Sequence, residues 1–211
     1  MAEEGTLILT SSAISNGGRI PRKYTQVGQG AVKDVSPPVE WYNVPEGTNC
    51  LALIMEDLGS VDPADSTANP FVHWVVVNIP PTMKGLPEGF TTKDVDDERD
   101  DASQIQEGPN DFKATGYRGP IPSDTEHRYE FHLYALDSAL KVPKKPSRDR
   151  VLDAMEGHIL ADAVLVASYG TEGAHMGHNN YMAPGQPHIA GPGRPEAHKN
   201  SYNPMGQIHG R

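Results

Sequence analysis

The 211-residue chain has a length that suits one domain with an appendage better than two full domains. Only 36% of the residues are hydrophobic, whereas 21 glycines and 19 prolines indicate many turns and argue against a helical bundle. The formal net charge of −10 argues against direct nucleic-acid binding, which needs a basic face, but it leaves room for one small positive pocket.

Short apolar segments separated by polar, proline-rich connections predict a mainly β fold. In chain order, the predicted strands are Leu7–Thr10, Val39–Trp41, Leu51–Glu56, Phe71–Ile79, Arg128–Leu136 and Ala163–Tyr169. The segment Leu51–Glu56 is almost continuously apolar, which is typical of a strand that is buried on both faces. In Arg128–Leu136 apolar residues alternate from Tyr129 onward, so one face of this strand is expected to be buried.

One helix is predicted over Ser147–Asp162. Four apolar residues between Val151 and Ile159 fall on one helical stripe, and Pro146 stands just before the start. Between the strands, Asp94–Asp111 carries a dense acidic run, for which a solvated loop is favoured over a cation site.

The composition changes after Gly170. Residues 171–211 are rich in Gly, Pro, Asn and His and almost lack Val, Leu and Ile, so they cannot bury enough apolar surface to fold alone. Five of the nine histidines lie there: His175, His178, His188, His198 and His209. Only His175-x-x-His178 approaches the tight spacing of metal ligands, so no metal or cofactor is expected. We therefore predict a domain over 1–170 and an extension over 171–211 that is flexible or packs on the domain or a partner subunit.

The single cysteine and the N-terminal residues bear on the cellular compartment of the protein. Cys50 is the only cysteine, so no intrachain disulfide can form. The first residues lack the charged-then-apolar pattern of a signal peptide, and no apolar run approaches the roughly 20 residues that span a bilayer. We expect a cytoplasmic protein without integral membrane association.

Polar, titratable residues cluster where apolar strands begin or end. Asp57 follows Leu51–Glu56, His73 lies inside Phe71–Ile79, and His127 and Tyr129 open the strand that ends at Leu136. Each also has a structural explanation. A lone histidine in a strand is more often a satisfied structural residue than a ligand, and an aspartate two residues before a glycine fits ordinary turn chemistry.

The order and spacing of these segments resemble one family, the phosphatidylethanolamine-binding protein (PEBP) family, and within it the bacterial and plant Raf-kinase-inhibitor-like branch. The resemblance runs from about Leu7 to Tyr169. The matching segments are Glu56-Asp57, His73–Pro80 (HWVVVNIP), Leu86–Gly89 (LPEG), Gly116–Pro122 (GYRGPIP), His127–Asp137 (HRYEFHLYALD) and Gly157–Ala161 (GHILA), the last of which is expected on the helix. Their combination is specific, whereas any single segment is not.

The resemblance implies a β-sandwich with a large central antiparallel sheet, a smaller sheet packed on it, and one or two helices near the C-terminus. It also implies an anion pocket at one end of the large sheet, lined by Asp57, His73, His127 and Tyr129, with Gly119 and Pro120 forming its rim. The chemistry of these residues agrees with an anion pocket. Two imidazoles and a tyrosine hydroxyl can donate hydrogen bonds to an anion, and a nearby aspartate favours protonated rings. A turn that contains glycine lets backbone amides approach the anion closely. Arg128 is expected to pair with a carboxylate instead of the ligand.

The chain departs from the family at its first motif, D-P-D-x-P. Asp57 remains, but the second aspartate and both prolines are missing, and Asp62-Pro63-Ala64-Asp65 follows as part of a longer pocket-side loop. The pocket is therefore expected to be less acidic and its wall looser.

Three functions fit these features. The first is a binding module for a small anionic ligand, a phosphate ester or carboxylate on a small molecule or headgroup. The second is a regulatory protein that docks on a kinase or transcription factor. The third is an enzyme that uses the same residues for acid–base chemistry, although no G-x-S-x-G nucleophile motif is present. A homodimer is compatible with all three.

Overall fold

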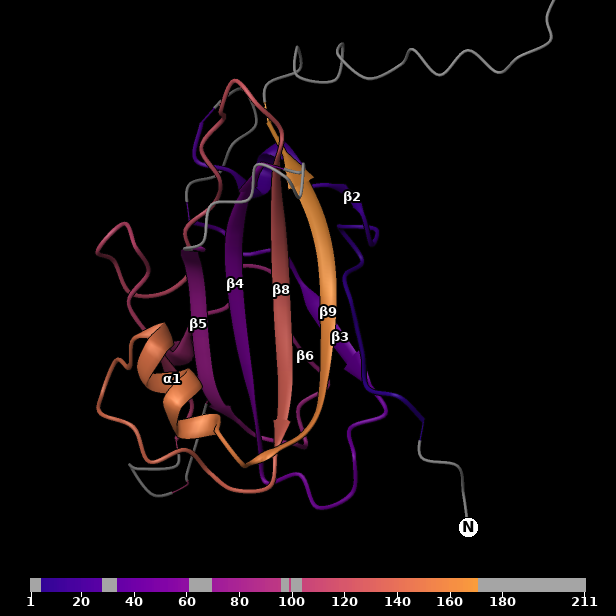
Figure 1. Cartoon of the computed structure of the whole chain (residues 1–211), viewed down its shortest axis with the longest axis vertical. Coiled ribbons are helices and arrows are strands. Elements are labelled where there is room, and N and C mark those ends of the chain that lie inside the picture. Colours follow the sequence, from indigo (N-terminus) through magenta and orange to yellow (C-terminus); the bar gives the residue numbers. More distant parts are fainter. Residues whose placement is uncertain (1–4, 28–33, 61–69, 96–98, 100–103, 171–211) are drawn as a thin grey trace, which may run out of the picture. The chain divides into compact units, whose positions relative to one another are not determined.

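The computed structural model describes residues 5–27, 34–60, 70–95, 99 and 104–170, which form two β-sheets and one α-helix (Figure 1). The large sheet has six strands in the order β2-β9-β8-β4-β5-β7. Its strands are β2 (Gly18–Arg19), β4 (Cys50–Ser60), β5 (Phe71–Ile79), β7 (Gln106–Glu107), β8 (His127–Leu136) and β9 (Ile159–Tyr169). Neighbouring strands are antiparallel except β2 and β9, which run parallel.

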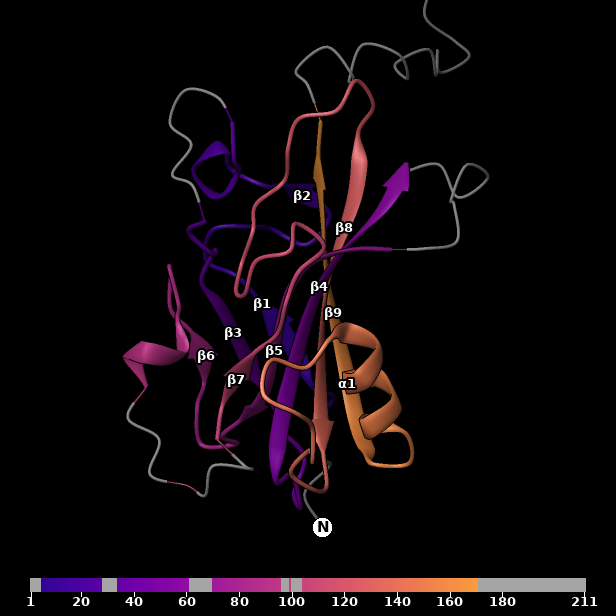
Figure 2. The same ribbon diagram turned by 90° about the vertical axis from the view of Figure 1, so that its left-hand side faces the viewer.

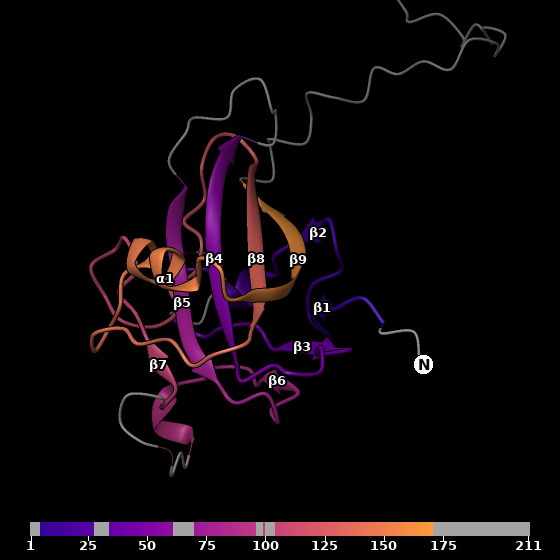
Figure 3. The same cartoon turned by 60° about the horizontal axis from the view of Figure 1, so that its bottom comes forward.

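The small sheet has the strand order β1-β3-β6. Its members are β1 (Ile8–Thr10), β3 (Val39–Tyr42) and β6 (Gly85–Leu86), and short 3-10 turns lie at Arg22–Tyr24 (η1) and Thr92–Asp94 (η3). Figure 2 shows the small sheet on one face of the large sheet and helix α1 (Arg148–Met155) on the other. Viewed from one end, β5, β4, β8 and β9 lie side by side (Figure 3). The predicted sandwich of a large and a smaller sheet is confirmed, with β2 as a short parallel addition.

Two apolar cores lie on the two faces of the large sheet. Between the sheets, the core is built around the buried side chains of Trp41, Leu53, Trp74, Phe131 and Leu133. Under α1, a second core contains Ile54, Val75, Val77, Val151 and Met155. Strand β4 contributes to both, and Leu51–Met55 are at most 1% exposed. This burial on both faces explains why the sequence of β4 is continuously apolar.

The predicted helix over Ser147–Asp162 is too long. Helix α1 begins at Arg148, with Ser147 as its N-cap, and ends at Met155. Gly157 then adopts a positive φ of 79°, which ends the helix, and the chain continues into β9 from Ile159. Ile159 pairs with Leu136 and β9 follows β8 along its length, so sheet hydrogen bonds replace the predicted last turn. The GHILA segment therefore lies in a turn and a strand.

Asn78 ties β5 to the connection that leads to α1. It lies at an irregularity of the β4–β5 ladder, with a φ of 56°, and is fully buried. Its side-chain amide donates to the Leu140 carbonyl (3.1 Å), and its side-chain oxygen accepts from the Leu140 N–H (2.8 Å). The side chain of Asn78 is buried and makes both hydrogen bonds to Leu140 while its backbone has a positive φ. These bonds therefore fix how the connection after β8 packs against the end of β5.

Replacing Asn78 tests this link. Asn78→Ala removes both side-chain hydrogen bonds. It also leaves alanine, which has a Cβ but no polar side chain to offset the strain, at a positive φ. We therefore expect the free energy of unfolding to fall by about 2–4 kcal/mol. Asn78→Gly removes the same bonds but tolerates the backbone, so it should lose less. Urea unfolding of both variants measures the difference. A loss below about 0.5 kcal/mol for Asn78→Ala would contradict the assignment.

Three sequence predictions fall wholly or partly outside the described residues. The Asp62–Asp65 loop and the extension over 171–211, with its five histidines, lie outside, as do 96–98 and 100–103 of the acidic run. In the part of the chain that is described, no helix is long and apolar enough to cross a membrane.

Candidate functional site

Asp57 and Tyr129 lie opposite each other in the β4–β8 ladder. Just beyond this pair the register shifts, with Gly59 at a positive φ of 80°, so that His127 pairs with Ser60. One oxygen of Asp57 accepts the Gly59 N–H (2.7 Å), and the other accepts Nδ1–H of His127 (2.8 Å). The Tyr129 hydroxyl lies close enough to Asp57 for the charge of that carboxylate to raise the pKa of the tyrosine. One carboxylate thus orients the two predicted site residues of β8.

His73 is the extra residue of a β-bulge. Met55 pairs with Trp74 and Glu56 pairs with Val72, so His73 has no partner of its own on β4. Bulges commonly redirect a side chain beside a functional site. Here the ring meets the segment that carries Arg118: Nδ1–H of His73 donates to the Arg118 carbonyl (2.6 Å), and the Arg118 N–H donates to the His73 carbonyl (3.0 Å). The paired bonds fix the ring orientation.

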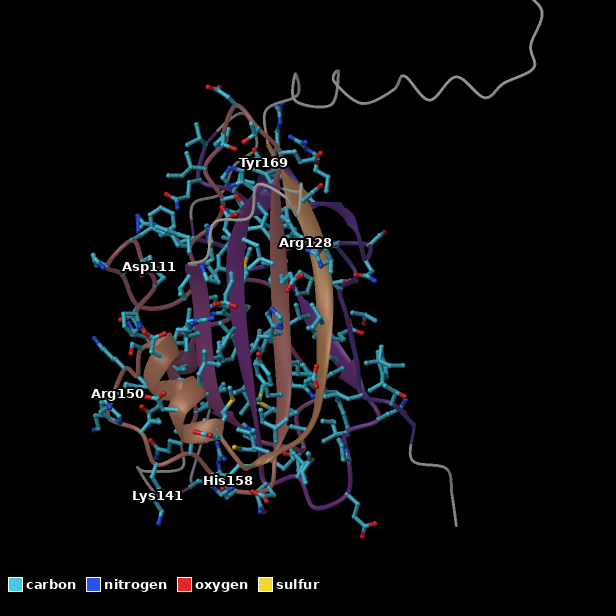
Figure 4. The ribbon with its side chains drawn as sticks, in the orientation of Figure 1. Asp111, Arg128, Lys141, Arg150, His158 and Tyr169 are labelled. Carbon is cyan, nitrogen blue, oxygen red and sulfur yellow. The ribbon has the colours of Figure 1, made fainter. Side chains whose placement is uncertain are left out.

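The ring of Tyr129 contacts both imidazoles. Its centroid lies 5.4 Å from that of His73, in an edge-on arrangement, and 6.5 Å from that of His127, in a stacked one. His73 and Tyr129 are each 2% exposed, whereas the His127 side chain is 26% exposed. His127 pairs with Tyr169, which marks the upper end of the large sheet in Figure 4. The cluster therefore has a buried side at His73 and an open side at His127.

Both imidazoles keep one nitrogen free. Each ring is held through Nδ1, and Nε2 of neither has a hydrogen-bond partner in the described part of the chain. Neither Nε2 is among the buried side-chain atoms that lack a partner. The His127 side chain is 26% exposed, so its ring reaches solvent, whereas His73 is 2% exposed. A carbonyl oxygen has no proton to give, so at this contact the ring proton of His73 lies on Nδ1.

Burial dominates the acid–base properties of His73. Burial lowers the pKa of its imidazole, the Arg118 carbonyl and the charges of Asp57 and Asp111 act in the opposite direction, and the charge of His127 lowers it further. Burial is the largest of these effects, so the net pKa of His73 lies below its ordinary value. The pKa of Tyr129 is raised, first by burial and then by the charge of Asp57, so its hydroxyl stays neutral.

Gly119 and Pro120 are buried beside the His73 contact. Their carbonyls accept hydrogen bonds from Gln26, from its side-chain amide (2.8 Å) and its backbone N–H (3.0 Å) respectively. A Cβ on Gly119 would lie 2.2 Å from the Tyr24 carbonyl oxygen, so only glycine fits. The Gly119 N–H has no acceptor among the described residues, which leaves it available as a donor.

Two phenylalanines that the sequence reasoning missed complete the surroundings of His73. The rings of Phe71 and Phe112 lie 4.8 Å apart in an edge-to-face contact, and each lies 5.4 Å from the His73 ring. The Arg118 guanidinium covers Phe112 at 5.8 Å. Phe71 stands two positions before His73 on β5, a spacing that signals a shared face, whereas no sequence pattern indicated Phe112.

A cavity of about 530 Å³ lies elsewhere, at the start of α1. Its lining includes Val72, Asn110, Asp111, Lys113, Ser147 and Arg148, and none of the predicted site residues. Its polar walls are engaged internally: Asp111 accepts the Val72 N–H (2.8 Å), and Arg148 pairs with Glu56. The two free imidazole nitrogens are therefore the better indication of a ligand site than the size of this cavity.

Two further observations bear on ion binding. Arg128 pairs with Glu130, as expected of a structural residue. Within the described ranges, no group of three or more His, Cys, Asp or Glu side chains is arranged to hold a metal ion.

The lowered pKa of His73 predicts an acid-sensitive fold. An unfolded histidine titrates near 6.5, so below that pH the unfolded chain binds a proton that buried His73 resists, and stability falls. His73→Gln keeps a donor for the Arg118 carbonyl and removes the titration. Between about pH 7 and pH 5 the free energy of unfolding should fall less in the variant than in wild type. The difference between the two slopes should be at most about 1.4 kcal/mol per pH unit. Urea unfolding at several pH values measures this, and parallel curves would contradict it.

Comparisons with known proteins agree with this geometry. Residues 10–170 match the family model described as phosphatidylethanolamine-binding protein. A UPF0098 protein of Methanothermobacter thermautotrophicus is 40% identical over 165 residues, covering 76% of this chain and 97% of the relative. The solved structure of a PEBP homologue from Chlamydia trachomatis shares 35% identity and a TM-score of 0.65, covering 79% of this chain and 99% of that one. E. coli YbcL shares 27% identity and a TM-score of 0.64, with 80% and 100% covered. The chain therefore belongs to the phosphatidylethanolamine-binding protein family.

Proposed function

We propose that this chain binds a small anion, a phosphate ester or carboxylate carried by a small molecule or headgroup, at Asp57, His73, His127 and Tyr129. The observation that carries the proposal is the pair of imidazoles that both contact the Tyr129 ring, each held through Nδ1 and each with an Nε2 that has no partner among the described residues. The name of the matching family model supports a phosphate-bearing ligand.

The electrostatic design supports an anion at the open side. Asp57 accepts Nδ1–H of His127 and so orients the ring, and a protonated ring would also present Nε2–H as a charged donor to an anion. Local donors of this kind allow a protein of net charge −10 to hold an anion, because close charged contacts outweigh screened surface charge.

The Asp57–His127 hydrogen bond also favours one alternative, a small-molecule enzyme. An aspartate that orients a histidine through Nδ1 leaves Nε2 as a general base or acid. Incubating a bound phosphate ester with the protein and following it by phosphorus NMR separates the two functions. An unchanged ligand supports binding, and steady conversion supports the enzyme.

The binding proposal predicts a loss of affinity in His127→Ala. The variant removes a charge-assisted hydrogen bond to the anion, so phosphate binding measured by calorimetry at mildly acidic pH should weaken by about 1.5–3 kcal/mol. Unchanged affinity would remove His127 from the site.

His158→Ala is the matched control. His158 also donates Nδ1–H to a carboxylate, that of Asp137, at 2.8 Å. It lies at the end of the large sheet opposite Tyr169 (Figure 4). The control variant should therefore bind phosphate as wild type does.

A further inference from the structure

We propose that the surface formed by α1 and by the connection that leads to it from β8 binds an acidic segment of a partner protein. We call this surface the basic face, and its central residues are Lys141 and Arg150. The inference goes beyond the proposed function, because the basic face shares no residue with the candidate site.

The sequence concentrates positive charge in one short segment. Residues 141–150 (KVPKKPSRDR) hold five of the 18 Lys and Arg residues but only one of the 28 Asp and Glu residues. Without this segment the chain would be still more acidic than its net charge of −10. The segment is therefore a local exception on an acidic protein, and its field attracts negatively charged groups to this part of the surface.

Lys141 and Arg150 leave their charges available to a partner. Both residues are exposed, and neither has a side-chain partner in the part of the chain that the structure describes. Arg148 differs, because it pairs with Glu56 and Asp149. Figure 4 shows Lys141 and Arg150 beside α1, away from Tyr169 at the other end of the large sheet.

The two cations line a hollow of about 390 Å³ between α1 and the connection that precedes it. The lining also contains apolar side chains and a carboxylate, those of Val142, Pro143, Ala154 and Asp153. A peptide segment that carries carboxylates on either side of an apolar side chain matches this lining. The apolar side chain covers the apolar wall, while the carboxylates contact Lys141 and Arg150.

The backbone that carries these cations is fixed near both ends. At its start, Leu140 is buried, and its backbone N–H and carbonyl both hydrogen-bond to the side chain of Asn78. At its end, Arg148 pairs with Glu56, and two prolines restrict the chain in between. A partner therefore meets cations on a backbone that is already ordered, which lowers the entropic cost of binding.

The extent of the positive charge favours a short acidic segment over a long polyanion. A nucleic acid or an anionic membrane would extend beyond the basic face and meet the negative charge of the remaining chain. A short protein segment contacts the basic face alone. Charge complementarity therefore favours a segment rich in aspartate or glutamate.

The test is an NMR titration of the nitrogen-15-labelled full chain with two blocked peptides. In one peptide glutamates flank a leucine, and in the other glutamines replace the glutamates. The acidic peptide should shift the backbone amides of residues 141–154 and leave that of His127 unchanged, and the glutamine peptide should bind at least about tenfold more weakly. Added salt should weaken the acidic peptide, because the screening length falls from about 10 Å at 0.1 M to about 3 Å at 1 M.

Variants of the basic face test the same contacts. Lys141→Gln and Arg150→Gln should each weaken acidic-peptide binding by about two- to fivefold, and the double variant by roughly the product. Asp153→Asn removes a repelling carboxylate and should strengthen binding by a similar factor. Lys84→Gln is the matched control, because Lys84 is exposed beside β6 in the small sheet, on the opposite side of the large sheet from α1 (Figure 2). It should bind the peptide as wild type does.

Each outcome decides the proposal. Equal affinity for the two peptides, shifts outside residues 141–154, or wild-type affinity in the double variant overturns it. Self-association in sedimentation experiments that the double variant abolishes would assign the face to a second copy of the chain and also overturn it. Tighter binding of phosphatidylserine vesicles or of an oligonucleotide than of the acidic peptide would do the same. None of these results depends on His127, so the proposed function is tested separately.

Discussion

Asp57 faces Tyr129 across the β4–β8 ladder, and every contact of the candidate site depends on that register. A slip of either strand by one residue would turn its site side chain to the other face of the sheet, away from its partner. Two local irregularities then add the histidines. The shift beyond Asp57 places His127 beside the carboxylate, and the bulge in β5 inserts His73 as an unpaired residue. The long strands provide rigidity, and the departures from their regular pairing provide the site.

The two histidines differ because their surroundings differ. His127 donates to the Asp57 carboxylate, and its side chain is 26% exposed. His73 meets a carbonyl among aromatic rings, and burial disfavours its charge. In a chain of net charge −10, this short-range arrangement, and not the overall field, would determine what binds.

Much of the fold was predictable because hydrophobic periodicity reflects burial directly. Phe71–Ile79 was predicted with its observed bounds, and the continuous apolar run of β4 matched a strand between two cores. The end of the helix was not predictable from periodicity, because Ile159 continues the helical stripe while Gly157 and the pairing with Leu136 convert the segment to a strand. The family resemblance indicated the four clustered side chains. The tautomer of His73 depends on a carbonyl 45 residues away, which no spacing reveals.

The central claim is that both imidazoles are held through Nδ1 and offer Nε2 to a ligand, with His73 neutral. Long-range hydrogen–nitrogen NMR correlations on the nitrogen-15-labelled chain report the protonation of each ring nitrogen, and the His73→Gln and His127→Ala variants assign the signals. The account predicts that near neutral pH His73 is protonated at Nδ1 alone, and that added phosphate shifts Nε2 of His73 and His127 but leaves His158 unchanged. A His73 ring protonated at Nε2, or phosphate shifts that avoid both residues, would contradict it.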